Sequence, residues 1–241
     1  MPDIQTSPKN RERRPVARFS ILHSPFSILR ILVHIGALIP LALIIVYAFT
    51  GHLTANPIQE ATFRTGKTAL TLLLLSLLCT PLNTLFGLKQ VLPLRRTLGL
   101  YAFFYICIHL FIFAVVDYGL DWELIKQTIV EKRYVLVGFS AFLLLLPLAL
   151  TSTKGWMRRL GKRWKQLHRL VYLAAVLVII HFVWLVKADI REPLLYGAIL
   201  GGLLLLRVPS VRRALTQLRY RFTRRRPATD AALPARPSAA E

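Results

Sequence analysis

The sequence predicts an all-α fold: a polytopic membrane bundle of six transmembrane helices with both termini in the cytoplasm. Hydrophobic residues make up 55% of the 241 positions, and they form long blocks rather than the short periodic stripes of a soluble helix. Lys and Arg concentrate between alternate blocks. A helix needs roughly 20 mostly apolar residues to cross hydrocarbon. Six segments come near that length: 31–49, 69–88, 97–116, 134–150, 167–186 and 193–208.

Charged residues and a proline define the first three spans. The first span follows a polar leader interrupted by prolines, and Pro40 in its middle should kink it, because proline removes a backbone hydrogen bond. The second span lies between Lys67 and Lys89, and the third lies between Arg96 and Asp117. The second and third blocks are thus bordered by charged side chains, whose entry into the hydrocarbon is unfavourable.

The last three spans lie in the second half of the chain. The fourth begins after Arg133 and carries Pro147 near its end, where a second kink is expected. The fifth ends at Lys187. The sixth is short, and its Gly197 and Gly201 form a G-x-x-x-G pattern, which favours close packing against another helix.

The distribution of positive charge sets the orientation. The two termini and the loops on their side hold 25 of the 32 Lys and Arg residues, and the opposite loops hold the other 7. Because cytoplasmic segments carry the Lys/Arg excess, both termini should be cytoplasmic. We expect a disordered basic cytoplasmic N-terminus (1–30), a six-helix transmembrane domain (31–208) and a basic cytoplasmic tail (209–241).

The net charge of +21 would suggest a nucleic-acid partner in a soluble protein. Here the charge borders membrane spans, so the basic tail, with Arg219, Arg221 and the run 224–226, is better explained by anionic lipid headgroups. The sequence thus predicts membrane lipid, and no nucleic acid, as the partner of these residues. The loops are too short for a catalytic domain, and no G-x-G-x-x-G stands between a strand and a helix.

Three histidines, His109, His168 and His181, lie within or at the edge of apolar spans. An ionisable side chain in a membrane span is costly and points to a functional site. A neutral imidazole offers one nitrogen lone pair, so two of them on facing helices can bind haem from both sides. With no catalytic domain of its own, such a chain would pass electrons between partners.

His109 and His181 are predicted to lie at the same depth. His109 lies eight residues before Asp117, and His181 lies six before Lys187. At 1.5 Å per residue these spacings place the two histidines about 12 and about 9 Å below the outer surface. We therefore predict that they are the axial ligands of one b-type haem in the outer half of the bundle.

His168 lies about 20 Å deeper than His181, toward the cytoplasm. On an ideal helix the two side chains would point about 140° apart, so a bend or different neighbours are required. Arg95 and Arg96 occupy the matching inner level of the third span, where they could pair with haem propionates or an anionic headgroup. His34 of the first span lies at the same level.

The alternative for each membrane histidine is a hydrogen bond across helices with no ligand bound. We favour that alternative for His34, leave both interpretations open for His168, and favour ligation for the pair His109 and His181. A different class of function, a small transporter or a lipid-binding membrane protein, is also open. Against it, the sequence shows no paired membrane carboxylates and no repeated half with matching broken helices.

Four segments carry a family resemblance: LGKRWKQLHRLVYLAAVLVIIHFVW (160–184), RRTLGLYAFFYICIHL (95–110), HIGALIPL (34–41) and TGKTAL (65–70). They resemble the MsrQ family, also called YedZ. Its members are the haem-binding membrane subunits of bacterial periplasmic methionine-sulfoxide reductase systems, within the ferric-reductase-like transmembrane superfamily. The resemblance covers about residues 31–208.

The resemblance implies a multi-pass protein of the bacterial inner membrane that carries haem b, one or two per chain, together with FMN. Electrons would come from the quinone pool or a cytoplasmic flavin reductase and pass to a periplasmic molybdopterin-containing catalytic subunit. The family's haem histidines fall on His109, His168 and His181. Superfamily members with two bis-histidine pairs carry another histidine near Arg95, so its absence argues against a second independently ligated haem.

The resemblance therefore implies a non-catalytic electron-transfer subunit of an oxidoreductase that repairs oxidised periplasmic proteins. A stand-alone ferric reductase, which would deliver electrons to metal chelates outside, is the redox alternative.

Overall fold

The computed structural model describes residues 25–186, 188–214 and 217, and every regular element among them is a helix. The predicted all-α fold is confirmed. The expected disorder of most of the N-terminal segment, the basic run 224–226 and Lys187 fall outside the described residues, as do Arg219 and Arg221.

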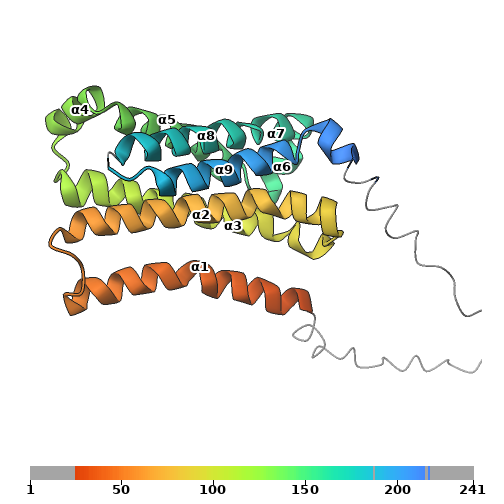
Figure 1. The fold of residues 1–241 in the computed structure, drawn as a ribbon, viewed down its shortest axis with the longest axis horizontal. Coiled ribbons are helices and arrows are strands. Elements are labelled where there is room, and N and C mark those ends of the chain that lie inside the picture. Colours follow the sequence, from red (N-terminus) through yellow and green to blue (C-terminus); the bar gives the residue numbers. More distant parts are fainter. Residues whose placement is uncertain (1–24, 187, 215–216, 218–241) are drawn as a thin grey trace, which may run out of the picture.

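The helices follow one another along the chain with short connections (Figure 1). They are α1 (Pro25–Thr50), α2 (Pro57–Phe86), η2 (Lys89–Val91), α3 (Leu94–Phe111), the π-helix η3 (Ile112–Asp117), α4 (Trp122–Glu131), α5 (Arg133–Leu150), α6 (Lys154–Leu160), α7 (Lys162–Leu167), α8 (Leu170–Leu185) and α9 (Arg191–Leu205).

Five helical stretches are long and apolar enough to cross a membrane, so the chain is a multi-pass membrane protein. They are Ser27–Thr50, Pro57–Phe86, Lys89–Asp117, Arg133–Leu150 and Lys162–Leu185. The predicted sixth span corresponds to α9, a helix of 15 residues that lies along α8 and α2 (Figure 1). The count of six spans and the cytoplasmic termini stay predictions.

α2 begins twelve residues before the apolar block that predicts it, at Pro57 rather than at Ala69. The side chain of Asn56 caps the helix by accepting a hydrogen bond from the backbone N–H of Gln59 (3.1 Å), and proline at the first helical position is preorganised for a helix. The apolar block marks where the helix meets hydrocarbon, whereas the cap marks where the backbone becomes helical.

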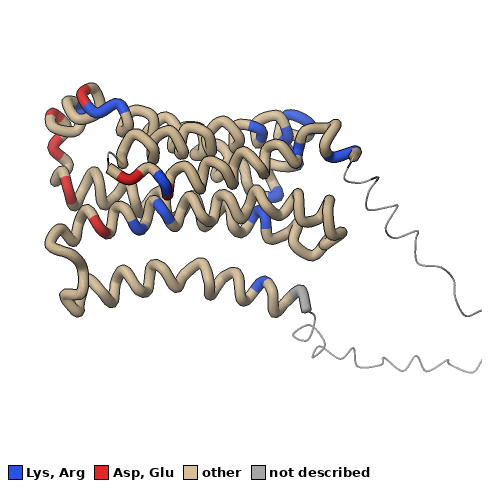
Figure 2. The backbone as a smooth tube through the Cα atoms, in the orientation of Figure 1, with Lys and Arg blue, Asp and Glu red and all other residues tan. Residues whose placement is uncertain are grey.

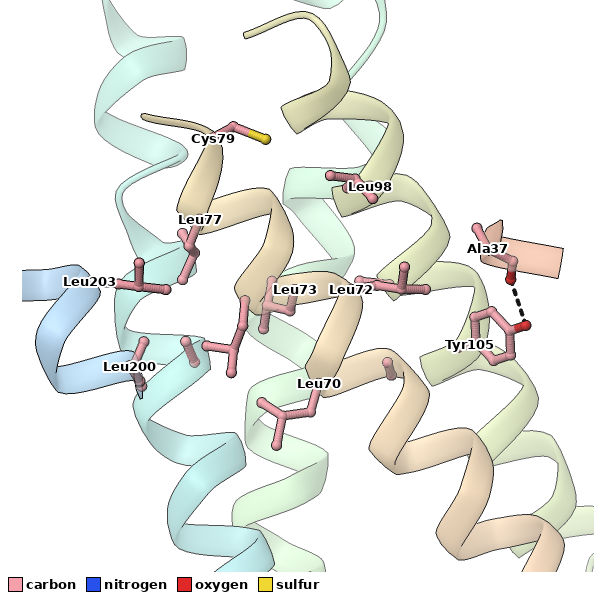
Figure 3. Packing of buried hydrophobic residues seen from close by; sticks show 14 of the residues in the cluster. Ala37, Leu70, Leu72, Leu73, Leu77, Cys79, Leu98, Tyr105, Leu200 and Leu203 are labelled. Atoms are coloured by element: carbon pink, nitrogen blue, oxygen red, sulfur yellow. Dashed lines mark hydrogen bonds between the residues drawn. The ribbon is translucent and has the colours of Figure 1, made fainter. Parts of the chain in front are cut away.

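Two antiparallel helix pairs form the centre of the bundle, α2 with α3 and α5 with α8 (Figure 1). The main core lies between α2, α3, α8 and α9, where Leu73, Leu77 and Ala102 are nearly inaccessible to solvent. Leu200 and Leu203 close this core from α9 (Figure 3). This shared core packs the four helices against one another.

α1 is attached to the bundle through Tyr105, which is fully buried on α3. Its hydroxyl donates to the Ala37 carbonyl (2.7 Å) and accepts from the Leu41 backbone N–H (3.0 Å) (Figure 3). In a regular helix these two backbone groups pair with each other. The inserted hydroxyl lies next to Pro40, the residue at which the sequence predicts a distorted helix.

Charge divides the bundle into two ends (Figure 2). We call the end that carries α4 the outer end and the end that carries α6 and α7 the inner end. The described Asp and Glu residues all lie toward the outer end: Glu60, Asp117, Asp121, Glu123, Glu131, Asp189 and Glu192. Within the described chain, the inner end carries only Lys and Arg as charged residues, which agrees with the positive-inside rule for a cytoplasmic side.

Candidate functional site

His109 of α3 and His181 of α8 face each other inside the bundle. Their ring centroids are 6.4 Å apart, and the ring planes are nearly perpendicular, at 86°. The two residues lie 72 positions apart in the chain, so the fold alone brings the rings together. The structure thus places side by side the two histidines for which the sequence predicts equal depth.

Each imidazole is held by a backbone carbonyl of the neighbouring helix. Nδ1 of His109 lies 2.9 Å from the Thr62 carbonyl oxygen, and Nδ1 of His181 lies 2.6 Å from that of Tyr134. A carbonyl oxygen only accepts, so Nδ1 carries the proton and donates in both rings. Within the described chain no hydrogen bond involves either Nε2, which leaves its lone pair free to bind a metal.

Two glycines lie against the two rings. A Cβ atom added to Gly66 of α2 would lie 3.1 Å from Cε1 and from Nδ1 of His109. A Cβ atom added to Gly138 of α5 would lie 2.6 Å from Nδ1 of His181. The rings therefore occupy the space that a side chain would fill at either position.

The separation of the rings fits a metal held between them. Because imidazole nitrogens bind metals at about 2 Å, two rings on opposite sides of one ion have centres slightly more than about 6 Å apart. The observed 6.4 Å agrees. Among the described residues, no group of three or more His, Cys, Asp or Glu could hold a bare ion. Two facing imidazoles suit a metal whose remaining positions are filled by its own macrocycle, as in haem.

One aromatic ring contacts this pair, and others pack near it in the chain. The ring of Tyr134 lies 5.9 Å from that of His181. Phe182, the residue after His181, is buried and makes edge contacts with Phe63 at 5.7 Å and with Tyr196 at 6.1 Å. These contacts pack α2, α8 and α9 together beside the histidine pair.

His168 lies at the inner end, where the chain breaks between α7 and α8. Its ring stacks on Trp164 at 3.9 Å, and its Nδ1 lies 3.1 Å from the Trp164 carbonyl oxygen one turn earlier. Nε2 lies 3.5 Å from the Ser152 hydroxyl. His168 and Arg169 thus interrupt the helix between α7 and α8, and the neighbours of His168 differ from those of His181.

The other predicted inner residues differ in their surroundings. Arg95 is half-buried at the start of α3, and its carbonyl accepts a hydrogen bond from the Ser76 hydroxyl (2.7 Å), whereas Arg96 is exposed. His34 is exposed on α1, and its Nδ1 lies 2.8 Å from the Tyr101 hydroxyl. That contact joins α1 to α3, in agreement with the interpretation of His34 as a residue that bonds across helices.

Arg207, at the end of α9, is an inner residue that sequence analysis did not single out. Its guanidinium donates hydrogen bonds to the Tyr172 hydroxyl and to the Leu77 carbonyl. Leu77 lies four residues before Pro81, which has no N–H to pair with that carbonyl. A proline inside a span is thus the sequence signal for such a partner, because a neighbouring helix must satisfy the freed carbonyl.

Comparisons with known proteins identify a family of membrane proteins. Residues 65–179 match the family described as ferric reductase like transmembrane component. The chain is similar to proteins named protein-methionine-sulfoxide reductase heme-binding subunit MsrQ. The one from Xanthomonas axonopodis pv. citri is 48% identical over 179 residues, 72% of this chain and 82% of the relative. The one from Rhodospirillum rubrum is 49% identical over 186 residues, 76% of this chain and 89% of the relative.

Proposed function

The chain belongs to the MsrQ family of heme-binding subunits of protein-methionine-sulfoxide reductases, and on that basis we propose that it carries electrons through haem b held by His109 and His181. The facing pair of rings is the observation that supports this assignment most directly. Haem bound there supplies a reversible one-electron carrier.

The residues of the site hold and orient the ligands. The Thr62 and Tyr134 carbonyls keep the proton on Nδ1 of each histidine, so that each Nε2 is available to iron. A hydrogen bond from the far ring nitrogen also makes the ligand more basic. The ring of Tyr134 packs beside that of His181. Fixed ligands in an apolar bundle change little when the oxidation state changes, which favours fast electron transfer.

We propose that the protein crosses the bacterial inner membrane six times with both termini in the cytoplasm. α9 and the turn after it, residues 191–208, would form the sixth span. An even number of spans returns the basic chain beyond α9 to the side of the N-terminus, as the charge distribution requires. The outer end, which is nearer to the histidine pair, then faces the periplasm.

The electron donor would be the quinone pool or a cytoplasmic flavin reductase at the inner end. The acceptor would be a periplasmic molybdopterin-containing methionine-sulfoxide reductase, so that the pair repairs oxidised periplasmic proteins. FMN would associate with the subunit. Arg95 and Arg96 would pair with haem propionates or lipid phosphate. One haem is proposed at His109 and His181, and His168 is the residue on which a second would depend.

A visible spectrum of the detergent-purified protein tests the haem assignment. We expect the bands of a low-spin haem b in the oxidised protein, and sharper bands after reduction with dithionite. A colourless protein from cells supplied with ample haem precursor would contradict the proposal. That result would favour a transporter or a lipid-binding protein, in which the histidines only join helices.

A second experiment identifies the acceptor, because the ferric-reductase-like family match also permits a stand-alone ferric reductase. The haem is reduced, and its reoxidation is followed with the molybdopterin catalytic subunit plus a protein that contains methionine sulfoxide. A parallel sample receives ferric citrate. Rapid reoxidation that needs the catalytic subunit supports the proposal. Equally rapid reoxidation by ferric citrate alone supports the alternative.

A further inference from the structure

The two ligand histidines are held in the same way by two separate helix pairs. In the α2–α3 pair, His109 bonds to the Thr62 carbonyl and packs on Gly66. In the α5–α8 pair, His181 bonds to the Tyr134 carbonyl and packs on Gly138. In both pairs the histidine follows its carbonyl partner by 47 residues, and the glycine comes one helical turn after that carbonyl.

A constant spacing in the sequence relates the two helix pairs. Thr62, Gly66 and His109 are followed 72 residues later by Tyr134, Gly138 and His181. The same offset pairs identical buried residues of the core: Ala69 with Ala141, Leu73 with Leu145, and Ala102 with Ala174. The two pairs are thus copies of one helical hairpin, and glycine occurs in both copies at the place where the imidazole packs.

The contact between glycine and imidazole is tighter in the α5–α8 pair. A Cβ atom at Gly138 would lie 2.6 Å from Nδ1 and 2.8 Å from Cε1 of the His181 ring, closer than Cβ atoms approach other atoms in folded proteins. The ring cannot retreat without lengthening its 2.6 Å hydrogen bond to Tyr134. At Gly66 the closest ring atoms are 3.1 Å from the added atom, so a shift of a few tenths of an ångström relieves the contact.

We infer that Gly66 and Gly138 are positioning residues for the haem ligands, an inference that rests on the proposed function. The absent side chains let each ring approach the backbone of the neighbouring helix, reach its carbonyl and turn Nε2 toward the opposite ring. Gly138 sets the position of His181 strictly, and Gly66 sets that of His109 more loosely. Neither glycine touches iron, so both act through the histidines.

Two substitutions test this inference, Gly138→Ala and Gly66→Ala. Alanine is a better helix former than glycine, so any loss reflects the contact with the ring. Gly201→Ala on α9 is the matched control, because an added Cβ atom meets nothing within 4 Å there. For each variant the haem content, the low-spin bands, the midpoint potential of the haem and the thermal unfolding of the protein are measured.

Gly138→Ala should weaken haem binding about 10- to 100-fold, as expected when an outer-sphere support of a ligand is lost, and convert remaining haem to a high-spin form. Gly66→Ala should retain its haem with a shifted midpoint potential. Gly201→Ala should match the parent protein. If the Gly138→Ala protein does not accumulate in the membrane, the comparison of Gly66→Ala with Gly201→Ala tests the inference by itself.

A Gly138→Ala protein with unchanged haem bands and potential would overturn the inference. So would a Gly66→Ala protein indistinguishable from Gly201→Ala. Failure of the proposed function looks different, because the parent protein would then lack haem.

Discussion

The α2–α3 and α5–α8 hairpins match at the outer end of the bundle and differ at the inner end. At the outer end each supplies a histidine, a carbonyl acceptor and a glycine. At the inner end the second hairpin carries His168, whose counterpart 72 residues earlier is Arg96. An arginine cannot bind iron, so the repeated scaffold offers two facing ligands at only one of its two levels.

The two hairpins also differ in the hydrogen bonding of a hydroxyl side chain near the inner level. Ser152 lies 3.5 Å from His168. Its counterpart Thr80 has a buried hydroxyl without a hydrogen-bond partner among the described residues. A shared backbone therefore does not make two equivalent sites, because a site held by two ligands needs one ligand from each hairpin.

We expect the strongest loss of haem when either histidine of the outer pair is replaced. His109→Ala and His181→Ala should each abolish the low-spin haem bands and remove most of the haem, because one axial ligand is lost from either hairpin. Haem per protein and the reduced-minus-oxidised spectrum measure this. His34→Ala, which removes an exposed histidine of α1, is the control and should keep its haem. Equal haem content in all three variants would refute the ligand assignment.

A smaller effect is expected at the unmatched inner level. His168→Ala should keep the low-spin bands of the outer haem, because His168 contacts Trp164 and Ser152 rather than a second histidine. Its haem content should equal that of the parent protein. Complete loss of the low-spin bands would show that the two levels are coupled. Loss of half of the haem would place a second haem at His168.

The next effect concerns stability at the inner end of the first hairpin. Arg207→Leu should leave the carbonyl of Leu77, freed by Pro81, without a partner in an apolar layer, which costs about 1–3 kcal/mol. The midpoint of thermal unfolding in detergent should fall. The control is Lys165→Leu on the exposed face of α7. Equal midpoints for both variants would mean that Arg207 does not join α9 to α2.

A smaller change is expected from the hydrogen bonds by which the first hairpin holds α1. Tyr105 bonds to α1, whereas its counterpart in the second hairpin is Leu177. Tyr105→Phe should lower stability by about 1 kcal/mol, because a buried carbonyl of α1 loses its donor. Tyr101→Phe removes only the bond to exposed His34 and should change the unfolding midpoint less. A larger loss for Tyr101→Phe would contradict this account of the attachment.

Local sequence features were sufficient to predict the helical membrane bundle and the central histidine pair. The length of an apolar block reflects the thickness of the hydrocarbon core, and the rise of a helix converts residue number into depth. For this reason His109 and His181 could be placed at one level before any contact was known.

Features that depend on contacts between helices could not be predicted in this way. The sequence analysis found no repeated half with matching broken helices, whereas the contacts of the two histidines reveal a pattern repeated 72 residues apart. Most paired positions differ, so the equivalence of Gly66 and Gly138 stands out once imidazoles pack on both. The role of Arg207 likewise follows from where α9 lies relative to Pro81. Depth and helicity are properties of a single segment, whereas the space beside a ring and the partner of a freed carbonyl belong to two segments at once. The contacts of the rings and of the freed carbonyl are therefore determined by the packing of the whole bundle.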